Sequence, residues 1–177
     1  MLTIDARSST LLVVDFQIRL MPAIEQGAAA VANARLLIDA AAMLGVPTVF
    51  TEENGKGLGP TVKELTADPS RLVHKMTFDA CREPGFLQRL AESHAVVVAG
   101  CEAHVCVLQT VLGLIDSGRR VFLVRDAVGA RRGESKETAV RRMEHHGAEV
   151  VTTEMVVFEW LETAEHPRFR EAIALVK

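Results

Sequence analysis

The chain has 177 residues, the length of one domain, and such a chain buries roughly 70% of the surface that its unfolded form exposes, so its core needs no disulfide or metal. Its 20 Lys and Arg residues and 23 Asp and Glu residues give a net charge of −3, and 49% of the residues are hydrophobic. This composition excludes a disordered, collagen-like or nucleic-acid-saturated chain. With no Tyr and one Trp, the chain also lacks the aromatics of a base-stacking platform.

Targeting and redox features predict a cytoplasmic location. No apolar run approaches the roughly 20 residues of a membrane span, and the starting segment MLTIDARSST lacks the apolar core and cleavage site of a secretory signal. Three cysteines at irregular spacing form neither a disulfide framework nor a zinc site. We therefore expect a cytoplasmic protein without metal or cofactor, whose partners include neither nucleic acid nor membrane.

A short apolar run rich in β-branched residues, followed by a helical stretch and a glycine, recurs along the chain. The runs predict strands over residues 11–15, 46–51, 72–75, 95–99, 121–125 and 149–152. The stretches between them predict helices over residues 27–44, from about 104 to 117 and from about 134 to 146. Gly45, Gly118 and Gly147 close three helices in the left-handed conformation that glycine adopts without penalty.

The strand pattern predicts a parallel sheet. The strands are apolar without alternation, which indicates burial on both faces, and their alternation with helices implies right-handed crossovers. We predict a three-layer α/β fold and, since no Pro-rich or Ser-rich linker interrupts the chain, a single domain over residues 1–177. The glycine-rich segment 52–60, EENGKGLGP, is expected to form a loop at the edge where parallel sheets bind ligands.

Candidate catalytic side chains stand at the ends of the predicted strands. Asp15, Lys75 and Asp126 each end or follow a strand, and the segment 100–106, GCEAHVC, connects the fourth strand to a helix. Ligands of an open parallel sheet bind beyond the carboxyl ends of its strands. These residues are therefore candidates for one site.

Cys106 falls in the first turn of the predicted helix. The dipole and free N–H groups of a helix N-terminus favour a thiolate, whose pKa can fall from about 8.5 to roughly 3.5–7.5 beside cations, and they can also bind an oxyanion. The alternative is that Cys106 is a small core hydrophobe, the interpretation kept for Cys81 and Cys101. His104 shares the turn, but residues two apart on a helix do not face each other.

Asp15 and Lys75 supply what a reactive thiol needs. Asp15 is either a capping acid or a functional carboxylate, and Lys75 is either a solvated strand end or a functional cation. A thiol nucleophile requires a base for its proton and a cation for its thiolate, so these residues and Cys106 fit one chemistry. Their spacing does not show that they meet. No HExxH or CxxC spacing indicates a metal site.

Segments spread over nearly the whole chain carry a resemblance to a known family. They are VVDFQ from residue 13, TEENGKGLGPTVKEL from 51, HKMTFDA from 74, GCEAHVCVLQT from 100, VFLVRDAVGAR from 121 and HPRFREAIALVK from 166. Through them the chain resembles the isochorismatase-like cysteine hydrolases, which include nicotinamidases and N-carbamoylsarcosine amidases. The glycine-rich and C-terminal segments resemble the isochorismatase domain-containing subgroup most.

The resemblance implies a Rossmann-like sheet of six parallel strands in the order 3-2-1-4-5-6, and a catalytic triad of Asp15, Lys75 and Cys106. It also implies a cis peptide between Cys101 and Glu102, with an oxyanion hole formed by the N–H groups of Glu102 and Cys106. The other side chains expected to line the substrate pocket are Phe16, Gln17, Phe78, His104 and Val105.

Two departures from family patterns bear on the reaction. Nicotinamidases hold a metal with an Asp-x-His motif after the second strand, where this chain has Glu52-Glu53-Asn54, so we expect neither that substrate nor a metal. True isochorismatases lack the nucleophilic Cys, so Cys106 argues against isochorismate. We predict a cysteine hydrolase that cleaves a small amide through a thioester. The alternatives are vinyl-ether hydrolysis without a covalent intermediate, with Asp15 as the acid, and a non-catalytic interaction protein.

The helix that contains Cys106 predicts a homo-oligomer. Its apolar side chains lie on more than one face, which suggests burial beyond a single sheet contact. These residues are Val107, Leu108, Val111, Leu112, Leu114 and Ile115. The alternative is that the sheet and the neighbouring helices cover them all.

Overall fold

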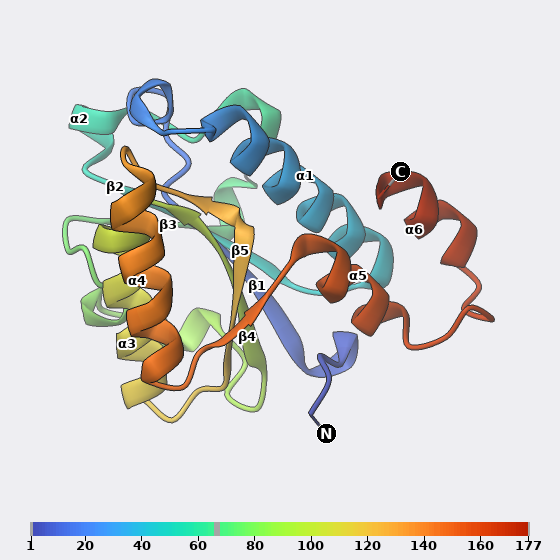
Figure 1. The fold of residues 1–177 in the computed structure, drawn as a ribbon. Helices are drawn as coiled ribbons and strands as arrows, with labels where there is room; N and C mark the ends of the chain where they lie inside the picture. Colours follow the sequence, from blue (N-terminus) through green and yellow to red (C-terminus); the bar gives the residue numbers. More distant parts are fainter. Residues whose placement is uncertain (1, 66–67, 177) are drawn as a thin grey trace.

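The fold is built on a parallel sheet that lies between two layers of helices (Figure 1). The computed structural model describes residues 2–65 and 68–176. The strands are β1 (Ser9–Val14), β2 (Thr48–Glu53), β3 (Leu72–Lys75), β4 (Ala95–Cys101), β5 (Val121–Gly129) and β6 (Glu149–Val151). The helices are α1 (Gly27–Leu44), α2 (Gly55–Leu58), α3 (Leu108–Asp116), α4 (Gly133–His145), α5 (Thr153–Leu161) and α6 (Phe169–Val176). A π-helical turn, Ala103–Val107, leads into α3.

The sheet has the predicted order. It contains six strands in the order β3-β2-β1-β4-β5-β6, and every neighbouring pair is parallel, which confirms the predicted topology. From β1 the chain adds β2 and β3 on one side of the sheet, and it then crosses back to add β4, β5 and β6 on the other side of β1. The topological switch point therefore lies between β1 and β4. Ligand sites of such sheets lie beyond the strand ends at this switch point, so the segments after β1 and β4 are placed to form one.

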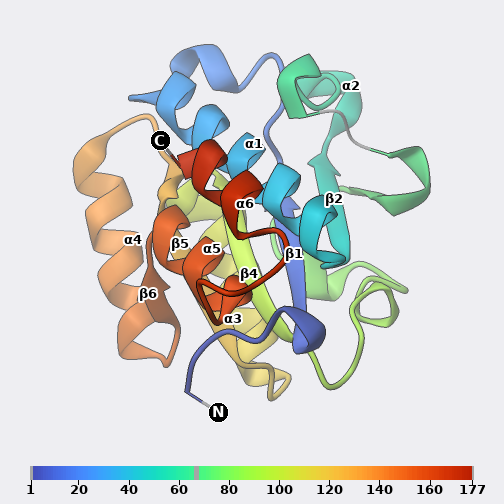
Figure 2. The same cartoon turned by 90° about the vertical axis from the view of Figure 1, so that its right-hand side faces the viewer.

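Both faces of the sheet are covered, which explains the unbroken apolar strands. All six residues of β1 are buried, and its four apolar residues alternate between two clusters. Leu11 and Val13 pack with α1, α5 and α6, whereas Leu12 and Val14 pack with α3 and α4. Figure 2 shows α1, α5 and α6 together over one face of the sheet.

Three helices end as the glycine positions predicted. Gly45, Gly118 and Gly147 have φ angles of +75°, +77° and +104°, which confirms left-handed residues at these helix ends. A residue with a Cβ is strained in this left-handed conformation, so glycine terminates the helix at least cost.

Two boundaries differ from the sequence-based expectation. The segment 52–60 is not simply a loop, because β2 continues through Glu53 and Gly55–Leu58 forms the short helix α2. The fifth strand also continues to Gly129, since it pairs with the end of β4. Asp126 therefore lies inside β5 and not beyond it. Its Oδ1 accepts hydrogen bonds from the backbone N–H and the hydroxyl of Thr153, both at 2.9 Å, so Asp126 supports the start of α5.

The apolar character of α1 also differs from expectation. This helix has 18 residues and a mean hydropathy of 1.4, so by length and composition alone it could cross a membrane. The core helix of a soluble protein passes the same test. Its inward residues Ala34, Leu37 and Ala41 pack in the core on the sheet, which accounts for the apolar stripe.

Candidate active site

Three side chains from distant parts of the chain meet at the switch point of the sheet. Asp15 follows β1, Lys75 ends β3, and Cys106 lies in the π-helical turn after β4. The Lys75 ammonium donates to Asp15 Oδ2 at 2.7 Å, and the negative charge of the same carboxylate acts on the Cys106 thiol. All three residues are buried, and Cys106 keeps 7% of its surface exposed. The structure therefore brings together the residues that the sequence could only propose as a set.

Asp15 is held tightly by its surroundings. Its φ of +51° is in the left-handed region, which Asp adopts more readily than most residues. The backbone N–H of Asp15 donates to the carbonyl of Thr51 at 3.1 Å, and the Thr51 hydroxyl donates to Asp15 Oδ1 at 2.6 Å. With Lys75 on Oδ2, each carboxylate oxygen has a donor. The carboxylate is thus fixed in orientation toward the sulfur.

Lys75 reaches Asp15 across β2. The lysine lies on β3, with β2 between it and β1, and its long side chain spans the gap with no exposed surface. Its Nζ also donates to the carbonyl of Thr77 at 3.1 Å. A buried charged group is costly unless it is paired and hydrogen-bonded, and Lys75 and Asp15 provide such a partner for each other.

The state of the Cys106 thiol differs from the expectation of a lowered pKa. Burial raises the pKa of Cys106, the negative charge of Asp15 raises it further, and Lys75 only partly opposes these effects. Desolvation of the thiolate by burial is the largest of these effects. The resting sulfur is therefore a neutral thiol beside the Asp15 carboxylate.

The turn after β4 presents Cys106 and anchors Glu102. The Cys101–Glu102 peptide is cis, as the resemblance implied. The carbonyl of Glu102 accepts the N–H groups of Val105 and Val107 at 3.0 and 3.2 Å, which closes the turn around Cys106. The Glu102 carboxylate accepts hydrogen bonds from the backbone N–H and from the Nε–H of Arg131, each at 3.0 Å. These contacts tie the turn to the segment before α4. The oxyanion role of the Glu102 and Cys106 N–H groups stays a prediction.

Phe16 and Gln17, expected as pocket walls, are buried in this structure, and substrate contact by them stays a prediction. Phe16 is 1% exposed and belongs to the core on the α1 side of the sheet. Gln17 is fully buried, donates to the carbonyls of Glu53 and Gly59 at 2.9 and 2.6 Å, and accepts the N–H of Glu53 at 2.9 Å. Both N–H groups of the Gln17 side chain are thus engaged with the backbone, and its oxygen also accepts a backbone hydrogen bond.

The other expected pocket residues keep accessible surface. Phe78, in the segment after Lys75, is 48% exposed. His104 and Val105 are half-buried on the turn that holds Cys106. His104 also lines a cleft of about 330 Å³ with Arg131, Arg132 and Ser135. Substrate contact by these three residues stays a prediction.

Thr51 and Glu53 are site residues that the sequence analysis missed. Thr51 binds Asp15, and Glu53 is the register partner of Lys75 in the β2–β3 pair. Burial raises the pKa of the Glu53 carboxyl, Asp15 adds to that increase, and Lys75 opposes it. The strand periodicity could have identified Glu53, because residues two apart on a strand share a face and Glu53 therefore lies on the face of Thr51. The sequence-based prediction ended the second strand at residue 51 and so placed Glu53 in a loop.

The Glu52-Glu53-Asn54 segment does not fit a metal site. The Glu52 carboxylate accepts the N–H and hydroxyl of Thr61 at 2.6 and 2.8 Å, so it serves to hold the loop after α2. Over residues 2–65 and 68–176, no group of three or more His, Cys, Asp or Glu side chains is arranged to hold a metal ion.

The fold and this site define an α/β protein of the isochorismatase family. Residues 9–155 match the model of the isochorismatase domain, so the chain belongs to that family of hydrolases. It is 34% identical over 170 residues to isochorismatase domain-containing protein 2 of Danio rerio, a match that covers 95% of this chain and 86% of that protein.

Two solved structures extend the comparison. A protein described as the MAR1 ribonuclease of Caenorhabditis elegans has a TM-score of 0.90 and 35% identity, and the match covers 98% of this chain and 92% of that one. The YcaC protein of Escherichia coli, described as an octameric hydrolase of unknown specificity, has a TM-score of 0.88 and 26% identity, with 99% and 88% of the two chains covered.

Proposed function

We propose that the protein is a cysteine hydrolase that cleaves the C–N bond of a small amide through a thioester on Cys106. The observation that supports this proposal is the Asp15 carboxylate, which binds the Lys75 ammonium group and whose negative charge acts on the Cys106 thiol. A neutral thiol beside an ionised carboxylate is a nucleophile with its general base already in place.

The first half-reaction forms the thioester. Cys106 Sγ attacks the carbonyl carbon as Asp15 takes the thiol proton, and Lys75 stays protonated while it balances the charge. The developing oxyanion accepts hydrogen bonds from the backbone N–H groups of Glu102 and Cys106. Loss of one such donor typically lowers the rate by about 10²–10³-fold. Asp15 then returns its proton to the nitrogen, the C–N bond breaks, and ammonia or a small amine leaves.

The second half-reaction releases the acid. Asp15, again ionised, takes a proton from a water molecule that attacks the thioester carbon. The C–S bond breaks, the sulfur regains the proton from Asp15, and the carboxylic acid leaves. One water is consumed for each C–N bond cleaved, and no oxidant or reductant is needed. Asp15 thus acts twice as base and twice as acid.

The decisive experiment is a screen of small primary amides with ammonia detection, run on the wild type and on Cys106→Ala. We expect turnover by the wild type and a loss of at least about 10³-fold in Cys106→Ala, because no other group supplies the nucleophile. Cys81→Ala, which removes a thiol outside the site, should retain activity and serves as the matched control. Retained turnover in Cys106→Ala would exclude the thioester mechanism.

Intact-mass measurement during turnover separates the rival reactions. The thioester mechanism leaves an acyl adduct on Cys106, whereas vinyl-ether hydrolysis, with Asp15 as acid, leaves none. The ribonuclease description of the nematode relative adds phosphodiester hydrolysis as a rival, so the screen includes a labelled RNA. A protein that turns over no compound in any arm would be a non-catalytic member of the family.

A further inference from the structure

Glu53 is presented to the catalytic residues by a rigid backbone. It ends β2, and its N–H and carbonyl are both hydrogen-bonded to the side chain of the fully buried Gln17, each at 2.9 Å. Its neighbour Asn54 donates its N–H to the carbonyl of Lys75 at 2.9 Å. The position of the Glu53 backbone is therefore fixed relative to Lys75.

The strand register directs the Glu53 side chain to the face that holds Cys106. Thr51 is the register partner of Val14, whose side chain packs in the same cluster as Cys106. Residues two apart on a strand share a face, so Glu53 lies on the face of Thr51. Register partners on neighbouring parallel strands also share a face, and the partner of Glu53 is Lys75. The charge of Glu53 accordingly acts on Asp15, Lys75 and Cys106.

The Glu53 carboxylate has no hydrogen-bond or ion-pair partner among the residues that the structure describes. The contrast with its neighbour is clear, since both oxygens of Glu52 face partners in Thr61 and His74. The proposed mechanism leaves Glu53 unused. A half-buried acceptor beside a nucleophile, with no hydrogen-bond donor among the described residues, is suited to a ligand that brings its own N–H groups.

We propose that Glu53 accepts a hydrogen bond from the nitrogen of the scissile amide and stabilises the positive charge that develops as this nitrogen leaves. This inference rests on the proposed amide hydrolysis. The nitrogen becomes cationic when Asp15 transfers its proton to it, before the C–N bond breaks. Glu53 gains no proton in this step. Its charge stabilises the transition state more than the neutral ground state, so it raises the rate of acylation.

The test compares an amide with an ester of the same acid. An ester has no N–H group and its leaving oxygen does not become cationic, so Glu53 offers it no advantage. The most reactive amide among acetamide, butyramide and benzamide is used with its methyl ester. We expect Glu53→Gln to lower kcat/KM for the amide by about tenfold or more and to change the ester value by less than about twofold.

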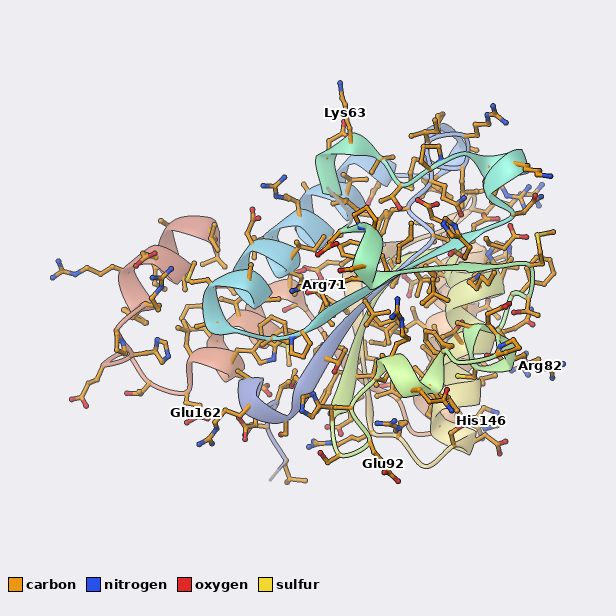
Figure 3. The ribbon with its side chains drawn as sticks, turned by 180° about the vertical axis from the view of Figure 1, so that it is seen from behind. Lys63, Arg71, Arg82, Glu92, His146 and Glu162 are labelled. Atoms are coloured by element: carbon orange, nitrogen blue, oxygen red, sulfur yellow. The ribbon has the colours of Figure 1, made fainter. Side chains whose placement is uncertain are left out.

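Matched controls separate this role from a structural one. Glu92→Gln makes the same change in net charge at an exposed residue. Glu92 lies just before the start of β4, whereas the site lies beyond the other end of the strands, so this substitution should alter neither rate (Figure 3). Equal loss on amide and ester in a folded Glu53→Gln protein, or no loss on either, would overturn this inference while leaving the amide hydrolysis intact. No Cys106-dependent turnover by the wild type would overturn both.

Discussion

Asp15 carries three interactions on one carboxylate, and they determine the chemical state of the site. Thr51 and Lys75 bind its two oxygens, and its negative charge acts on the Cys106 thiol. The carboxylate is thereby held in place next to a sulfur that stays protonated. In the proposed mechanism, reactivity depends on proton transfer during attack, and a stored thiolate is not required.

This arrangement predicts slow alkylation of the free protein. Burial raises the pKa of Cys81 and of Cys101 to about 12, and that of Cys106 is also raised. The reactive thiolate fraction therefore grows only as pH rises well above neutral. We expect iodoacetamide to modify Cys106 more slowly than free cysteine at pH 7, with a rate that still increases at pH 9, as followed by peptide mass spectrometry. A rapid reaction that is constant from about pH 6 upward would show a stored thiolate instead.

At the scale of elements, the site depends on the close approach of β1 and β4. Val14 and Gly100 are register partners at the end of this strand pair, directly before Asp15 and the turn that holds Cys106. A Cβ on Gly100 would lie 2.5 Å from the Val14 Cβ and 2.6 Å from its carbonyl oxygen. Glycine at this position therefore allows the segments that carry Asp15 and Cys106 to approach each other.

Substitution of this glycine should damage the fold and the site together. We expect Gly100→Ala to destabilise the protein by about 3 kcal/mol or more, because the strand pair must separate, and to abolish amide turnover. Gly118→Ala is the matched control, since its Cβ meets no atom within 4 Å and only the left-handed backbone is penalised, by about 1–2 kcal/mol. Urea unfolding measures both changes. Equal losses in the two variants would refute the packing argument.

At the scale of the whole molecule, packing within the fold accounts for most of the apolar side chains on the helix that was predicted to mediate oligomer formation. Val107, Val111 and Leu114 are buried against the sheet, but Leu112 and Ile115 are only partly buried at its margin. The octameric description of the Escherichia coli relative supports assembly in this family. We therefore propose that the protein is a homo-oligomer.

Sedimentation velocity tests this proposal without a ligand. At micromolar concentration we expect a mass of at least twice the 19.3 kDa of one chain. Leu112→Lys, at the margin of the α3 face, should shift the distribution toward the monomer if that face forms the contact. A wild type that sediments at 19.3 kDa over the tested range would disprove the assembly.

Much of the architecture was predictable because local rules determine it. Apolar runs and helix-ending glycines placed the six strands, and the family resemblance supplied their order. The same rules misplaced Asp126, which looked like a strand end but lies within β5. Its strand continues because the neighbouring β4 offers pairing partners, and such information is not local.

The sequence by itself determined the alternation of strands and helices, and it singled out Asp15, Lys75 and Cys106 as chemically matched residues. Only the tertiary structure decided that the three meet, that the thiol is neutral, and that Glu53 faces them while Gln17 supports the strand end beneath. The reason is that hydrophobic periodicity acts over a few residues, whereas burial and charge arise from segments far apart in the chain, and these long-range contacts set proton affinity.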